Sequence, residues 1–69
     1  MEYQQRVIEE RAELQTKWDK LCAFIDKAEN DPVAPFASLP LAEQALLRAQ
    51  GSVMQAYLDI LDARVRMFR

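Results

Sequence analysis

The chain has 69 residues and a formal net charge of -2; 51% of its residues are hydrophobic and 29% are charged. This composition is typical of a folded protein and argues against disorder. The single cysteine excludes an internal disulfide, and the lack of histidine argues against a zinc site. One glycine and three prolines provide few turns for a many-stranded β fold. A chain this short is only marginally stable alone, which leaves self-association as its source of extra stability.

Two further patterns limit the class of protein. The sequence has no apolar run long enough for a membrane-spanning helix. Its first six residues, Met1 to Arg6, are polar, which argues against a secretory signal and favours a cytoplasmic protein with a reduced thiol. The net charge of -2 provides no general basic field for phosphates, so nucleic acid is not an expected partner.

Residues 2–29 predict the first helix. The segment has no glycine or proline and is rich in good helix formers. Its apolar residues recur at heptad spacing and form one stripe, which comprises Val7, Leu14, Trp18, Leu21, Ile25 and Ala28. Pro32 ends the helix, because proline cannot continue the hydrogen-bond ladder and restricts the residue before it.

Residues 30–38 predict an extended connector, and residues 39–68 predict the second helix. Ser38 is the expected N-cap of that helix, and Pro40 falls in its first turn. Two lines of mostly apolar residues run side by side along the helix. One comprises Leu46, Gln50, Val53, Tyr57, Ile60, Arg64 and Met67, and the other Leu47, Gly51, Met54, Leu58, Leu61, Val65 and Phe68.

These elements predict an all-α fold in which residues 1–69 form one antiparallel two-helix hairpin. Facing residues then have numbers that add up to about 68, which places Trp18 opposite Gly51. Gly51 either leaves room for the indole or simply weakens the helix, and the first interpretation is favoured over the second.

The second helix carries more apolar surface than one partner helix can cover. Exposing all of it would create a larger patch than monomers normally tolerate. We therefore predict a homo-oligomeric helical bundle, with a four-helix dimer as the minimum. The expected interface between chains comprises Leu47, Gly51, Met54, Leu58, Leu61 and Val65.

No motif in the sequence predicts catalysis. Glu9, Glu10 and Glu13 cluster on a charge-rich helix face, where a solvated face explains them better than acid–base chemistry. Cys22 has no histidine partner and is better explained as a buried structural thiol. Gly-rich phosphate loops and nucleophile elbows are absent. We predict a non-enzyme with no catalytic residue, no metal ligand and no cofactor.

Three arginines gather in the last six positions, namely Arg64, Arg66 and Arg69. The hairpin brings Tyr3 and Arg6 close to them. Guanidinium groups suit phosphate binding. Cations at a helix C-terminus also offset the helix dipole, and this second interpretation is favoured.

Polar residues also interrupt the apolar lines, at Arg11 on the first helix and at Gln50 on the second. Such residues either fix the register and the oligomeric state or line a ligand pocket between protomers, and the register role is favoured.

Three segments resemble a group of very short phage and prophage proteins. They are Tyr3-Gln4-Gln5-Arg6-Val7-Ile8-Glu9-Glu10, the connector Phe36-Ala37-Ser38-Leu39-Pro40, and the ending with Tyr57, Leu61, Arg64 and Phe68. Small phage proteins of this build include helical-hairpin oligomers such as the anti-CBASS and anti-Thoeris sponges, which sequester cyclic nucleotide immune signals between protomers. The resemblance implies a protein that binds such a signal in the host cytoplasm without cleaving it.

The resemblance also implies roles for particular residues. Arginines would hold the phosphates, and Tyr3, Tyr57 or Phe68 would stack on the bases. The ligand-binding residues expected on this basis are Tyr3, Arg6, Arg11, Tyr57, Arg64, Arg66, Phe68 and Arg69. The alternative is a protein-binding inhibitor or adaptor whose apolar helix face engages a helix of a host protein.

Overall fold

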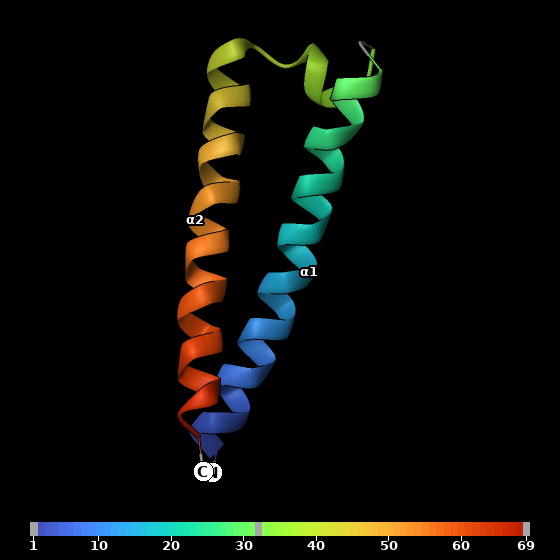
Figure 1. The fold of residues 1–69 in the computed structure, drawn as a ribbon. Coiled ribbons are helices and arrows are strands. Elements are labelled where there is room, and N and C mark those ends of the chain that lie inside the picture. The colour runs from blue at the N-terminus through green and yellow to red at the C-terminus, as the bar shows by residue number, and fades with distance from the viewer. Residues whose placement is uncertain (1, 32, 69) are drawn as a thin grey trace.

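Two long helices and a short 3-10 helix make up the structure, a computed structural model that describes residues 2–31 and 33–68. Helix α1 spans Glu2–Asn30, η1 spans Pro35–Ser38 and α2 spans Leu41–Arg66. The two α-helices run antiparallel as a hairpin of 48 × 17 × 15 Å (Figure 1). The all-α hairpin is thus the observed fold, and no strand occurs within the described ranges. We call the end that carries η1 the closed end and the end with Glu2 and Arg66 the open end.

The connector is more structured than the sequence predicts. The backbone N–H of Ala34 donates to the Asp31 carbonyl at 3.0 Å, and Pro35–Ser38 then form the 3-10 helix η1. Ser38 is not the N-cap of α2, because its hydroxyl donates to the Ala34 carbonyl at 3.5 Å. The N-cap is Pro40, which provides no side-chain hydrogen bond, so α2 begins two residues later than expected. Gln44 ties this start down by donating its side-chain amide to the Leu39 carbonyl at 2.8 Å.

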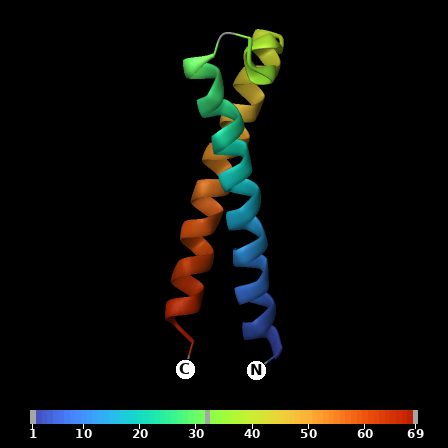
Figure 2. The same cartoon turned by 90° about the vertical axis from the view of Figure 1, so that its right-hand side faces the viewer.

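Phe36 is the anchor of the closed end. Its side chain is 1% exposed and meets the ring of Phe24 edge to face, with ring centroids 5.7 Å apart. The guanidinium of Arg48 lies 5.1 Å from the centre of the Phe36 ring, within the range of a cation–π contact. Phe36 therefore contacts both α-helices. The helices are inclined to each other. In Figure 1 they are farthest apart at the closed end, whereas in Figure 2 they cross in the upper half and separate towards the open end.

The core lies between the two helices. Val7 and Ile25 of α1 and Leu58 and Leu61 of α2 are buried there, and Leu61 is fully buried. The predicted interface between chains includes Leu58 and Leu61, and an interface residue must be exposed in the single chain. Leu58 and Leu61 are instead buried inside one hairpin. Leu47, Gly51, Met54 and Val65 of the same line are only half-buried.

The exposed apolar line of α2 is the one that begins at Leu46. Leu46, Val53, Ile60 and Met67 are 65%, 68%, 56% and 78% exposed, and we call these four residues the apolar flank. Periodicity could not choose between two apolar lines that adjoin each other. Contacts between distant residues decide it, since Arg11 pairs with Asp62 and Trp18 donates to the Gly51 carbonyl at 3.2 Å. Both partners on α2 lie on or beside the line of Leu58 and Leu61.

Gly51 faces Trp18 as predicted, but the indole does not need the space that glycine leaves. The nearest side-chain atom to a Cβ added at position 51 is Leu21 Cδ2, at 3.5 Å. That separation is an ordinary van der Waals contact, so the hairpin itself has room for alanine. The indole interacts with the carbonyl of Gly51 and does not occupy the place of a missing side chain.

Replacing Gly51 with alanine should therefore stabilise the hairpin. We expect a gain of about 1 kcal/mol in the free energy of unfolding, because alanine is the better helix former and meets no clash. Urea denaturation followed by circular dichroism measures it. Gly51→Val is the matched control and should be destabilising, since its extra methyl groups would press on Leu21. A loss of stability in Gly51→Ala would contradict the packing described here.

Candidate functional site

Two aromatic rings and an arginine form a hollow at the open end. Tyr3 lies in the first turn of α1 and Phe68 lies just after the end of α2, and their rings meet edge to face with centroids 5.9 Å apart. Together with Arg64 and Met67 they line a hollow of about 210 Å³. The structure thus brings together three of the predicted ligand-binding residues: Tyr3, Arg64 and Phe68. The antiparallel fold accounts for this, because it places the first turn of α1 beside the end of α2.

Arg11 is engaged within the hairpin. Its guanidinium forms a salt bridge with Asp62, and a second donor reaches the other carboxylate oxygen at 3.4 Å. The hydrogen bond from Arg11, more than its charge, lowers the pKa of Asp62 below its ordinary value, and Arg66 adds a smaller lowering effect. Arg11 therefore joins the two helices, a contact that fits the register role, and its guanidinium is already neutralised.

The remaining predicted ligand residues have other partners or lie elsewhere on the surface. The hydroxyl of Tyr57 donates a hydrogen bond to Glu10, which raises the pKa of Tyr57. Arg6 forms an exposed ion pair with Glu2 at 2.9 Å. Arg66 is exposed on the last turn of α2, and Arg69 lies outside the described residues. Tyr57, Arg6 and Arg66 therefore do not line the hollow at the open end.

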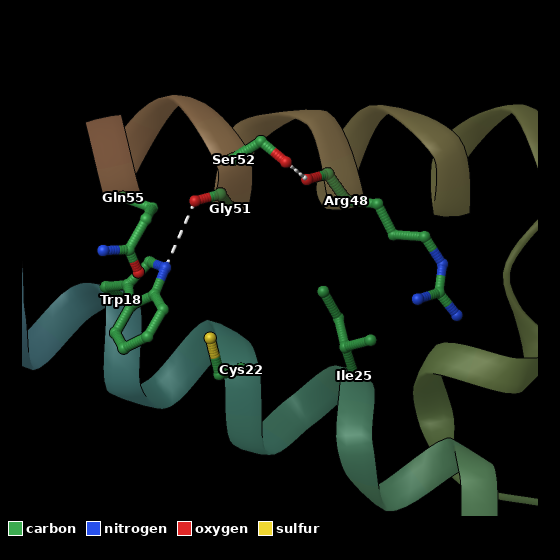
Figure 3. A pocket seen from close by; sticks show the side chains of 7 residues that line it. All are labelled: Trp18, Cys22, Ile25, Arg48, Gly51, Ser52 and Gln55. Carbon is green, nitrogen blue, oxygen red and sulfur yellow. Dashed lines mark hydrogen bonds between the residues drawn. The ribbon is translucent and has the colours of Figure 1, made fainter. Parts of the chain in front are cut away.

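A larger hollow lies between the two helices, nearer the middle of the hairpin (Figure 3). We call it the central groove. It has a volume of about 460 Å³ and is lined by Trp18, Cys22, Ile25, Arg48, Gly51, Ser52 and Gln55. This volume falls within the range of about 300–1,000 Å³ that is usual for small-molecule sites, whereas the hollow at the open end is smaller.

The lining of the central groove combines an aromatic ring, polar groups and one cation. The indole of Trp18 is held in place by its hydrogen bond to the Gly51 carbonyl, with Gln55 beside it (Figure 3). Cys22 and Ile25 belong to α1, across the groove from the α2 residues. The pKa of the Cys22 thiol is raised mainly by its partial burial and to a smaller extent by the negative charges of Asp26 and Asp19. Raised in this way, the pKa favours a neutral thiol, which is a poor nucleophile.

Sequence reasoning missed this groove. Residues of both helices line it, so no local pattern reveals it. One indication was present, since Arg48 is the only basic residue between Lys27 and Arg64. A smaller hollow of about 240 Å³ lies on the other side of Arg48, towards η1, where Phe36 and Gln44 are among its lining residues.

Two possible site types find no support in the described part of the chain. Residues 2–31 and 33–68 contain no group of three or more metal-ligating side chains arranged to hold an ion. None of the helices within these ranges combines the length and the apolar character that crossing a membrane requires.

Comparison with known proteins identifies a family. A family model described as Sequestin matches residues 1–67, which is nearly the whole chain. No curated protein matches the chain, and no solved structure matches it. The family's name refers to sequestration, and it indicates binding of a ligand rather than catalysis.

The Arg11–Asp62 pair predicts how stability depends on pH. Because the pKa of Asp62 is lower in the folded state, the pair contributes fully above the ordinary value of 3.8 and is lost as the pH falls through the folded-state pKa. Asp62→Asn should therefore lower the melting temperature at neutral pH, and its difference from the parent should shrink in acid. Melting curves from neutral pH to about pH 2 test this. The exposed Glu13→Gln is the control, and a constant difference for Asp62→Asn would refute the assignment.

Proposed function

The chain belongs to the Sequestin family, and we propose that it oligomerises and sequesters a cyclic nucleotide immune signal without cleaving it. In this proposal it is a phage-type protein that counteracts host defence. Family membership supports the sequestration, and the hollow with Tyr3, Phe68 and Arg64 supports the ligand class. Aromatic rings stack on nucleobases, and a guanidinium holds a phosphate through paired hydrogen bonds.

One chain supplies only part of the proposed site. The hollow at the open end has about 210 Å³, below the usual range for small-molecule sites. Arg64 is exposed beside it, and Met67 belongs to the apolar flank. A second chain that packs along the apolar flank in the same direction would add its own rings and guanidinium to this hollow. Ligand binding and assembly are linked in this proposal.

The apolar flank supports the assembly. Val53 and Ile60 are 68% and 56% exposed, and they follow each other at heptad spacing with Leu46 and Met67. Two copies of α2 that meet along this flank would form a four-helix bundle with a twofold axis. The interface proposed now is the apolar flank, in place of the line that contains Leu58 and Leu61.

Native mass spectrometry tests the assembly. We expect a discrete dimer or higher oligomer for the parent and a folded monomer for Val53→Glu, because a carboxylate would enter an apolar interface. Leu58→Glu is the comparison, and it should unfold the chain because it buries a charge inside the hairpin. A parent that is monomeric at micromolar concentration would refute the assembly and favour the alternative, a helix of a host protein bound on the apolar flank.

Calorimetric titration tests the sequestration. We expect cyclic dinucleotides, with cyclic di-AMP as the first probe, to bind the parent and to be recovered intact by chromatography. Arg64→Gln should weaken binding by about tenfold or more, because a charge-assisted hydrogen bond to phosphate is lost. Lys20→Gln, an exposed cation on α1, is the matched control and should bind like the parent. Absence of heat and of a shift in melting temperature across cyclic mono- and dinucleotides would refute the proposal.

A further inference from the structure

The central groove has features of a binding site that the hairpin fold does not require. Gly51 lies in the middle of α2, where glycine costs about fivefold in helix stability relative to alanine. The packing of the hairpin does not demand it, since a Cβ at this position would meet Leu21 at an ordinary 3.5 Å. The position lines the groove, and any larger side chain there would add atoms to its wall.

The aromatic wall of the groove is fixed in advance. The indole N–H of Trp18 donates to the Gly51 carbonyl at 3.2 Å, which orients the ring. Trp18 is only half-buried, so part of the indole stays accessible from the groove. A ring that is already oriented loses little entropy when a second ring packs against it, and base–aromatic stacking tolerates every nucleobase.

The cation of the groove is also held in place. Arg48 is the only charged residue among those that line it. Its guanidinium rests over the Phe36 ring, and no carboxylate within 4.0 Å neutralises it among the described residues. The Arg11 and Arg6 guanidiniums, by contrast, are paired with Asp62 and Glu2. Arg48 is therefore the cation of the groove, and it remains available to an anion.

The groove also stays open in the proposed assembly. At 100° per residue, Arg48, Ser52 and Gln55 lie roughly 100–160° around α2 from Val53, on a different side of the helix from the apolar flank. A second chain on the apolar flank would therefore leave the groove uncovered. Unlike the hollow at the open end, the central groove reaches the size of a small-molecule site within a single chain.

We propose that the central groove is a second ligand site, separate from the open end, that takes the base and phosphate of a nucleotide. The base lies against Trp18 between Gly51 and Gln55, and the phosphate accepts hydrogen bonds from Arg48. The inference rests on the proposed function for the class of ligand and adds a site that one hairpin completes by itself.

Trp18 is the only tryptophan of the chain, so its fluorescence reports directly on the groove. We expect AMP and cyclic di-AMP to change this fluorescence saturably. Adenosine should bind about tenfold or more weakly, because it lacks the anion for Arg48. Inorganic phosphate alone should leave the fluorescence unchanged, because it has no ring to place on the indole.

Variants separate the two sites. Arg48→Gln should weaken the fluorescence-detected binding by about tenfold or more. Arg48→Lys should give a smaller loss, since it keeps the charge without the fork. Lys20→Gln, an exposed cation that lines neither hollow, is the matched control and should leave the fluorescence titration unchanged. Circular dichroism confirms that each variant remains helical.

Two results would overturn the second site. If calorimetry detects AMP or cyclic di-AMP while Trp18 stays silent and Arg48→Gln binds like the parent, the groove is not a site and the proposed sequestration stands. If neither calorimetry nor fluorescence detects any nucleotide, the proposed function and the groove site fail together.

Discussion

Phe36 is the contact on which the shape of the hairpin depends. It is buried between Phe24 of α1 and Arg48 of α2, and it sits at the closed end of the hairpin. Nearer the open end, Leu58 and Leu61 are buried between the helices and Arg11 pairs with Asp62. Arg48 links the anchor to the central groove, because it lies over the Phe36 ring and also lines the groove.

The same geometry separates the surfaces of α2. One side packs on α1, one side lines the groove around Arg48, and the third carries the apolar flank with Val53 and Ile60. A two-helix hairpin buries only one such side, so most of α2 remains available for partners. In a longer protein these sides would be covered by further helices. In the proposed assembly, one of these sides would contact a second chain and another would contact the ligand.

Much of this architecture was predictable from the sequence, and its limits have physical causes. Helix-forming composition and Pro32 indicate the two helices and the turn between them, and antiparallel pairing places Tyr3 near Phe68 and Trp18 near Gly51. The sequence could not show which of two adjoining apolar lines on α2 is buried, because both have the same period. The contacts that decide it join residues far apart in the chain. The central groove escaped prediction for the same reason, since residues of both helices line it and no local motif marks it.

Marginal stability and ligand binding are connected in a chain of this kind. A hairpin with one narrow core gains little from its own packing, so anything that bridges α1 and α2 adds appreciably to its stability. A ligand in the central groove would contact Trp18 on one helix and Arg48 on the other. At a hundred times its dissociation constant it would stabilise the folded chain by about 2.7 kcal/mol, which is large beside the stability of so small a domain. A sequestering protein has no reaction to complete and has only to hold its ligand, so its fold and its affinity are free to depend on the same contacts.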